Sequence, residues 1–134
     1  MFRGNYPSRV DKKGRFKLPA DFKRQIDERY SGKFYVTSYD GQSVELYPME
    51  EWEKAEAELL SMQGFNAREL PADYCQNMLN YGQLVEMDSQ GRLSFPQSLP
   101  QSLRERMGTS SKVAVVGKLT HLEVRCFETF LAGC

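Results

Sequence analysis

The stretch VDKKGRFKLP occupies residues 10–19, and a second version of it, MDSQGRLSFP, occupies residues 87–96. Four residues recur at a fixed offset of 77: Asp11, Gly14, Arg15 and Pro19 correspond to Asp88, Gly91, Arg92 and Pro96. The apolar alternation after the arginine is repeated as well, as FKL in one copy and LSF in the other. A duplication at a fixed offset is typical of two equivalent structural units that pack on each other.

Each copy predicts a tight turn followed by a short strand. In the pattern D-x-x-G, the aspartate side chain can accept hydrogen bonds from nearby backbone amides, and the glycine tolerates a positive φ. We therefore assign a structural and orienting role to Asp11, Asp88, Gly14 and Gly91. The alternation of apolar and polar residues predicts a half-buried strand, and the proline ends it because proline cannot donate to a strand ladder.

The sequence after each strand predicts a short helix and then a hairpin. Pro19 is favourable at the start of a helix over residues 20–29, whereas Pro100 delays the start of the helix in the second copy. The predicted hairpin strands are residues 34–38 with 43–47, and residues 113–116 with 122–125. The unit is therefore strand, turn, strand, short helix and hairpin.

Further helices are predicted between the two units. Pro48 is followed closely by three glutamates, which is a strong helix start. Asn66 and Glu69 have the spacing of a helix cap, and the helix they begin should run to about Asn80.

The length and composition are those of one compact domain. The 134 residues are 40% apolar and 27% charged, as in ordinary globular proteins. We predict a single domain over residues 1–134, made of a first repeat with a C-terminal helix (1–63), a helical connection (64–82) and a second repeat (83–134). No apolar run approaches the roughly 18 residues that span a bilayer, and no signal core is evident at the start. We therefore expect a cytoplasmic protein without a membrane partner.

Charge is distributed unevenly although the formal net charge is zero. Residues 1–24 contain eight basic and two acidic side chains, a local balance of +6. Residues 40–73 contain nine acidic and two basic side chains, a local balance of −7. Such polarity can mark an anion-binding face or charged surfaces that attract each other between subunits, and two ordinary solvated faces are the alternative.

Nothing in the sequence predicts catalysis or a cofactor. His121 is the only histidine, and its position at a strand start favours a structural or surface role. The three cysteines (Cys75, Cys126 and Cys134) lack the spacing of metal ligands. The glycines form neither a dinucleotide fingerprint nor a phosphate loop. We therefore expect no enzyme activity, no metal, no cofactor and no small-molecule substrate.

The Asp-x-x-x-Arg pattern is the sharpest chemical feature. The Asp11 carboxylate is close enough along the chain to hold the Arg15 guanidinium in a fixed direction. That guanidinium is a planar fork of donors suited to phosphate oxygens or to the edge of guanine. Lys12 and Lys13 lie on the same turn, and Lys17 points outward from the next strand, so these residues predict an anion-binding cluster. Alternatively, the aspartate and arginine form a structural clamp, and the lysines are merely solvated.

The two copies differ in charge. Three cations of the first copy, Lys12, Lys13 and Lys17, correspond to Ser89, Gln90 and Ser94 in the second. The second copy keeps Arg92. We therefore expect the first copy to form the principal nucleic-acid face and the second copy mainly to complete a barrel.

Several segments together resemble the MraZ family. They are MFRG at the start, DKKGRFKLP with the helix after it, LYPxxEW at 46–52, DSQGRLSFP, and VAVVG at 113–117. Their order and spacing match the family along most of the chain. The resemblance implies a mainly β fold with helices (α+β), namely a double-split, swapped-hairpin β-barrel related to AbrB and built from two tandem internal repeats.

The resemblance also implies a function. MraZ proteins are bacterial transcriptional regulators whose genes open the division and cell-wall cluster. By resemblance, this chain would be a nucleoid-associated repressor that forms a ring-shaped homo-oligomer and binds tandem repeats in double-stranded promoter DNA upstream of its own gene cluster. The DNA-binding residues carried over by position are Arg3, Lys12, Lys13, Arg15 and Arg92, and the outward position of Lys17 adds it to the predicted set. The alternatives are a ring-forming scaffold for protein interactions and an AbrB-like antitoxin.

Overall fold

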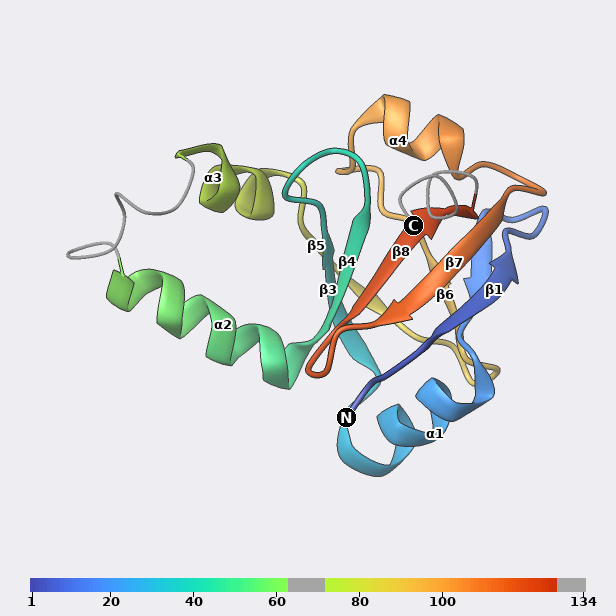
Figure 1. Cartoon of the computed structure of the whole chain (residues 1–134), viewed down its shortest axis with the longest axis horizontal. Coiled ribbons are helices and arrows are strands. Elements are labelled where there is room, and N and C mark those ends of the chain that lie inside the picture. The colour runs from blue at the N-terminus through green and yellow to red at the C-terminus, as the bar shows by residue number, and fades with distance from the viewer. Residues whose placement is uncertain (63–71, 128–134) are drawn as a thin grey trace.

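The computed structural model describes residues 1–62 and 72–127, which form a mixed α+β structure (Figure 1). The strands are β1 (Asn5–Arg9), β2 (Arg15–Lys17), β3 (Lys33–Thr37), β4 (Val44–Pro48), β5 (Gln83–Glu86), β6 (Arg92–Ser94), β7 (Lys112–Gly117) and β8 (Leu122–Cys126). The helices are α1 (Ala20–Arg29), α2 (Met49–Met62), α3 (Ala72–Asn80) and α4 (Gln101–Arg106). The α+β class and both predicted hairpins are confirmed.

The strands form one open antiparallel sheet and one separate ribbon. The sheet has six strands in the order β1-β7-β8-β4-β3-β5, and β2 pairs only with β6 in the ribbon. A closed barrel requires every strand to have two hydrogen-bonded neighbours. Among the described residues, β1 and β5 stand at the edges of the sheet with one neighbour each, so no closed barrel is found and the predicted swapped-hairpin β-barrel is not confirmed.

Segments from the two halves of the sequence are interleaved. β1 pairs with β7, and β5 pairs with β3, so each half places its first strand beside the hairpin of the other half. In the ribbon, β2 from the first copy pairs with β6 from the second, and Phe16 lies directly opposite Leu93. The two versions of the repeated stretch therefore lie side by side in space.

Inward side chains hold the ribbon on the core. Phe16 and Leu93 are each 1% exposed, and Phe16 stacks on Phe95 with ring centroids 4.8 Å apart. α1 packs into the same core with Phe22 and Ile26, which are four residues apart on one helix face. Each such side chain contributes roughly 1.5–3 kcal/mol when fully buried. The outward residues of the ribbon consequently lie on strands that are packed firmly against the core.

Prolines set the helix starts that the sequence predicts. α1 begins directly after Pro19 and α4 directly after Pro100, and each proline has a φ of −54°, close to the helical value. α2 begins directly after Pro48. α3 ends at Asn80 as predicted, whereas its predicted cap at Asn66 lies outside the described residues.

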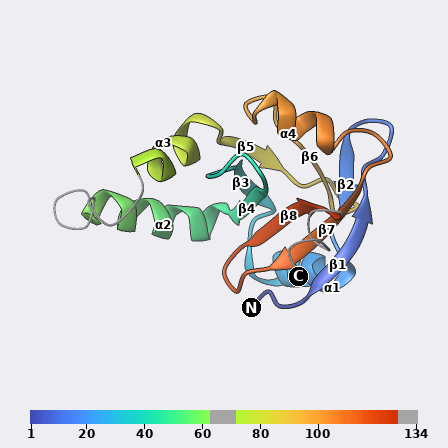
Figure 2. The same ribbon diagram turned by 45° about the horizontal axis from the view of Figure 1, so that its top comes forward.

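α2 and α3 extend away from the β3–β5 side of the sheet (Figure 2). α2 is anchored by Trp52, whose ring stacks on Tyr35 with centroids 4.0 Å apart. α3 is anchored by the carbonyl of Met78, which accepts hydrogen bonds from the hydroxyls of Tyr35 at 2.8 Å and Thr37 at 2.7 Å. The predicted junction between residues 63 and 64 lies outside the described residues. Within the two described ranges, no helix has the length and apolar character that a bilayer span requires.

Two glutamates meet at the centre of the sheet. Glu45 on β4 and Glu123 on β8 are register partners and are 1% and 4% exposed. Glu45 Oε2 lies 2.9 Å from Nε2 of His121, and Glu123 Oε1 lies 3.2 Å from Nε of Arg125. His121 is thus a structural partner of a buried carboxylate. In the part of the chain that is described, no group of three or more His, Cys, Asp or Glu side chains could hold a metal ion.

Candidate nucleic-acid interface

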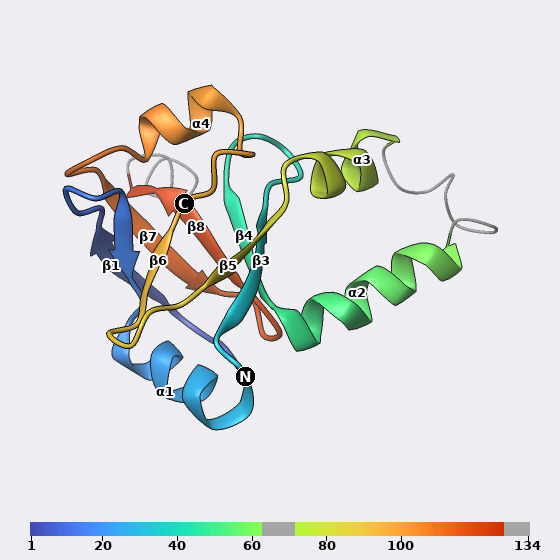
Figure 3. The same cartoon turned by 180° about the vertical axis from the view of Figure 1, so that it is seen from behind.

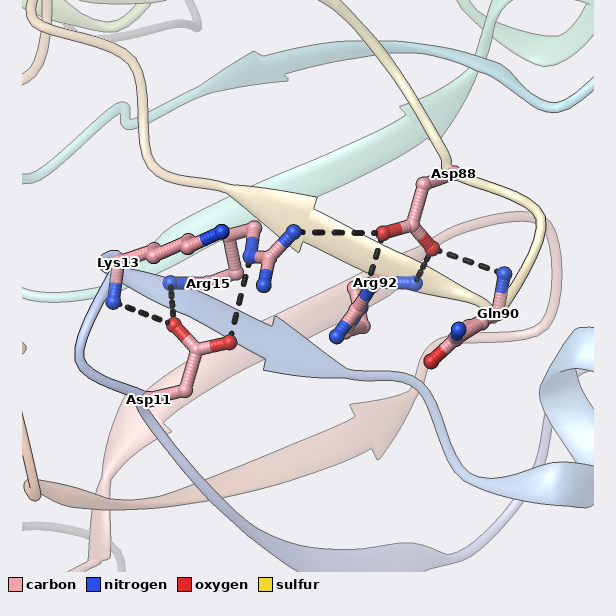
Figure 4. A network of polar contacts seen from close by, with 6 residues as sticks. All are labelled: Asp11, Lys13, Arg15, Asp88, Gln90 and Arg92. Atoms are coloured by element: carbon pink, nitrogen blue, oxygen red, sulfur yellow. Dashed lines mark hydrogen bonds and ion pairs between the residues drawn. The ribbon is translucent and has the colours of Figure 1, made fainter.

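The first Asp turn is built by one carboxylate and one glycine. Asp11 Oδ1 accepts hydrogen bonds from the backbone amides of Lys13 at 2.8 Å and Arg15 at 2.9 Å (Figure 4). The Gly14 amide donates to the Asp11 carbonyl at 3.0 Å, and Gly14 has a φ of +75°. Only glycine adopts that conformation without a steric cost. The turn therefore needs both residue types at the observed spacing.

The second Asp turn repeats this geometry. Asp88 Oδ1 accepts hydrogen bonds from the amides of Gln90 and Arg92, both at 2.9 Å (Figure 4). The Gly91 amide donates to the Asp88 carbonyl at 3.0 Å, and Gly91 has a φ of +79°. Ser89 and Gln90 stand where the first turn has Lys12 and Lys13, and the two turns nevertheless have the same backbone hydrogen bonds.

The same aspartates hold the arginine side chains. Arg15 Nε donates to Asp11 Oδ2 at 3.2 Å, and Arg92 Nε donates to Asp88 Oδ2 at 2.8 Å. Arg15 Nη1 also lies 3.7 Å from Asp88 Oδ2. Asp88 therefore contacts both arginines, and it connects the two copies of the motif across the ribbon. Both guanidiniums are fixed in direction while parts of them stay exposed.

Both carboxylates are ionised at neutral pH. The hydrogen bond from the Arg15 backbone amide is the largest effect that holds the pKa of Asp11 below its ordinary value of 3.8. The hydrogen bond from the Arg92 amide does the same for the pKa of Asp88. A carboxylate that accepts several hydrogen bonds stays charged because protonation would remove an acceptor. Asp11 and Asp88 are thus permanent anchors for the arginines around neutrality.

The outward face of the ribbon is basic and contains cations from both copies. Phe16 and Leu93 point to the core, so their neighbours along each strand point outward. Lys17 lies directly opposite Arg92, and Arg15 lies opposite Ser94. Arg15, Lys17 and Arg92 therefore form one surface, which we call the ribbon face. The second copy supplies part of this surface in addition to completing the fold.

The other predicted DNA-binding residues are divided between two places. Lys12 and Lys13 are exposed on the first Asp turn, next to the ribbon face. Arg3 is also exposed but precedes β1, beside the loop that joins β7 to β8. The length of β1 separates it from the first Asp turn. Within one chain, the structure does not bring Arg3 together with the turn lysines.

Sequence reasoning missed that the two arginines share one surface. The motif predicts each turn separately, and only the antiparallel β2–β6 pairing places Lys17 against Arg92. The fixed offset of 77 was the available signal, because equivalent units often pack about a local two-fold axis. It indicated packing between the copies without giving the strand register.

The chain is similar to known proteins over both copies of the motif. The family model described as "MraZ protein, putative antitoxin-like" matches residues 1–73 and 78–131. The chain is 48% identical over 130 residues to the "Transcriptional regulator MraZ" of Acidobacterium capsulatum, covering 97% of this chain and 85% of the relative. The protein of that name from Koribacter versatilis is 48% identical over 130 residues (93% and 82% covered), and that from Haemophilus influenzae is 33% identical over 125 residues (92% and 79% covered). The chain belongs to the MraZ family.

Proposed function

We propose that the protein is a transcriptional regulator that binds double-stranded DNA through the ribbon face. The observation that carries this proposal is the common outward face of Arg15, Lys17 and Arg92 on a two-stranded ribbon. The major groove of B-DNA admits a two-stranded β-ribbon, and some regulators read DNA with strands. The name shared by the relatives supports a role in transcription.

The proposed roles follow from the chemistry of each side chain. Arg15 and Arg92 present forks of donors that can pair with the O6 and N7 atoms of guanine, and Asp11 and Asp88 set their direction. Lys17, with the exposed lysines of the first Asp turn, would contact phosphates. Phosphate contacts supply affinity that falls steeply with salt, whereas base contacts supply specificity.

We also propose that the chain is a single domain of two repeats, residues 1–63 and 83–134, joined by a helical connection at 64–82. The order strand, strand, helix, strand, strand occurs on both sides of α2 and α3. The pairing of β2 with β6 supports this division, because corresponding segments then face each other.

The target proposed for this regulator is the tandem repeats upstream of its own division and cell-wall gene cluster, where it would act as a cytoplasmic, nucleoid-associated repressor. A ring-shaped homo-oligomer would engage several repeats at once. Linked weak sites gain affinity by avidity without stronger individual contacts. The acidic region at 40–73 and the basic region at 1–24 offer complementary charge for contacts between subunits.

Two other functions are kept as alternatives. A ring-forming scaffold would use the basic surface to bind another protein, and an AbrB-like antitoxin would bind a toxin. The family description includes the term antitoxin-like, which favours keeping the second candidate. Binding to duplex DNA with a sequence preference separates a regulator from a scaffold.

The test is fluorescence anisotropy of the full chain on its own upstream duplex and on a shuffled duplex, at about 50 and about 200 mM salt. We expect preference for the native duplex, lost in Arg15→Ala. Lys54→Ala, which removes one exposed cation from the acidic helix α2, is the control and should bind normally. No preference at either salt concentration would reject the regulator and favour the scaffold.

The two arginines should not be equivalent. We expect Arg15→Ala to lose more DNA affinity than Arg92→Ala, because Arg15 adjoins the exposed lysines of the first Asp turn. Each guanine contact is worth roughly 1–3 kcal/mol of discrimination. Equal losses in two folded variants would show that both copies contribute alike.

A further inference from the structure

A hollow of about 460 Å³ lies beside the first Asp turn. Its lining includes Arg9, Arg106, Ser110, Ser111, Lys112 and Phe127. The loop that joins α4 to β7 is tied to Val10, whose amide donates to the Ser111 carbonyl at 3.0 Å and whose carbonyl accepts from the Ser110 amide at 2.9 Å. That loop and the first Asp turn lie side by side in both the front and the back views (Figures 1 and 3).

We propose that this hollow binds a phosphate group, and that in the DNA complex it holds a phosphate of the duplex backbone. The second part of the proposal rests on the proposed function. The first part rests on the arrangement of three cations, Arg9, Arg106 and Lys112, and can be tested without DNA.

The three cations are held in place by neutral groups. Arg9 Nη1 donates to the Ser110 carbonyl at 3.0 Å, and Arg106 Nη2 donates to the Gly41 carbonyl at 3.2 Å. Lys112 Nζ lies 4.0 Å from the centroid of the Phe127 ring. Within residues 1–62 and 72–127, no ion pair includes any of the three. Among the described residues, the hollow thus contains fixed positive charge, and no acidic side chain is among those that line it.

The strand register places two of these cations in direct opposition. Arg9 at the end of β1 is the register partner of Lys112 at the start of β7. Like charges directly opposite each other destabilise a sheet. The corresponding pair at the other edge of the sheet is Lys33 with Glu86, where the charges are opposite. Arg9 thus stands where the other pair has the acidic Glu86, and the two like charges destabilise the free sheet. A bound anion would offset this repulsion.

Phosphate is the anion that fits these donors best. Two guanidiniums and an ammonium supply charge-assisted hydrogen bonds to several oxygens at once, and the hydroxyls of Ser110 and Ser111 add neutral donors. Arg9 is separated from Asp11 by a single residue, so one end of the hollow adjoins the first Asp turn, on which Lys12 and Lys13 are exposed. A duplex on the ribbon face would bring its backbone to this edge.

The first arm of the test compares the double variant Arg106→Ala/Lys112→Ala with the matched control Lys33→Ala. Anisotropy on the native and shuffled duplexes should show Kd raised roughly tenfold for both duplexes in the double variant. The slope of log Kd against log salt should fall by about one, since one phosphate contact is lost. Lys33→Ala, with Glu86 as its neighbour, should leave both quantities near wild type.

The second arm measures thermal unfolding with sodium pyrophosphate, against sodium chloride of equal ionic strength, without DNA. Pyrophosphate should stabilise the wild type and Lys33→Ala but not the double variant, because a ligand stabilises the state that binds it. If the wild type binds no DNA but pyrophosphate stabilises it selectively, the phosphate site stands and the regulator fails. Normal DNA binding by the double variant overturns the backbone contact, and equal pyrophosphate effects on all three proteins overturn the site.

Discussion

Replacing Glu123 by glutamine should remove a loss of stability that the wild type suffers as the pH rises. Glu123 and Glu45 are register partners at the centre of the sheet and are 4% and 1% exposed. Burial, followed by the charge and hydrogen bond of Glu45, raises the pKa of Glu123 above its ordinary value of 4.5. Glu45 Oε1 is buried and accepts no hydrogen bond from the described residues. Protonated Glu123 carries an O–H group, which is the kind of donor that its register partner lacks.

The sign and size of the effect follow from proton linkage. Because the pKa is raised in the folded state, the stability contribution is complete below about pH 4.5 and is lost as the pH rises through the raised pKa. One proton gives a slope of at most about 1.4 kcal/mol per pH unit. Glutamine at position 123 stays neutral and offers an N–H donor to Glu45 at every pH. The unfolding free energy of Glu123→Gln, minus that of the wild type, should therefore rise across this window and then become constant.

The assay is urea unfolding from about pH 4 to about pH 8, followed by the fluorescence of Trp52, the only tryptophan. His121 contacts Glu45, which both proteins keep, whereas the Arg125 ion pair belongs to Glu123 itself, so the difference between the curves reports on Glu123 and its partner. Glu53→Gln, an exposed carboxylate on α2, is the control and should show no trend. A difference between Glu123→Gln and wild type that does not change with pH would refute the raised pKa of Glu123.

Three further predictions concern the ribbon and its surroundings. Phe16→Ala should lower the unfolding free energy by roughly 3–5 kcal/mol, because a buried ring is lost. Phe16→Leu should lower it less, and equal losses in urea unfolding would argue against a packing role for the ring. Gly117→Ala should cost roughly 1–3 kcal/mol, because a Cβ there would lie 2.5 Å from the Arg3 backbone nitrogen. Gly108→Ala, whose Cβ would lie 3.4 Å from the nearest atom, should cost less by thermal unfolding, and the reverse order would contradict the contact geometry. Because the pKa of Asp88 is lowered, its contribution to stability is present above about pH 3.8 and is lost as the pH falls through the lowered value. Asp88→Asn should therefore lose less unfolding free energy than the wild type as the pH falls through this range. An equal loss in both proteins would contradict the role of Asp88 as the partner of Arg92.

Local sequence signals predicted most of the secondary structure. Pro19, Pro48 and Pro100 precede the starts of α1, α2 and α4, because proline fixes φ and needs no amide donor at a helix start. Both Asp turns also followed from local chemistry. Gly14 and Gly91 adopt the positive φ that the turns require. These features depend on residues that are close together in the chain, and they can therefore be predicted from a single sequence.

The predicted β-barrel is not confirmed, and no closed barrel is found among the described residues, for a reason that the sequence does not contain. Strand closure depends on hydrogen bonds between edge strands that are distant in the chain, and apolar alternation is the same in an open sheet and a barrel. β1 and β5 remain at opposite edges of the sheet, and the short β2 and β6 pair with each other instead.

The sequence by itself determined the two Asp turns, the helix starts, the hairpins and the identity of the arginine and lysine side chains that the ribbon face uses. Only the tertiary structure decided which side chains from distant parts of the chain meet. The β2–β6 register joins Lys17 to Arg92, the β1–β7 register opposes Arg9 to Lys112, and the β4–β8 register buries two glutamates together. Each of these contacts joins residues more than 70 positions apart, and a shift of one residue in register would turn every side chain to the other face.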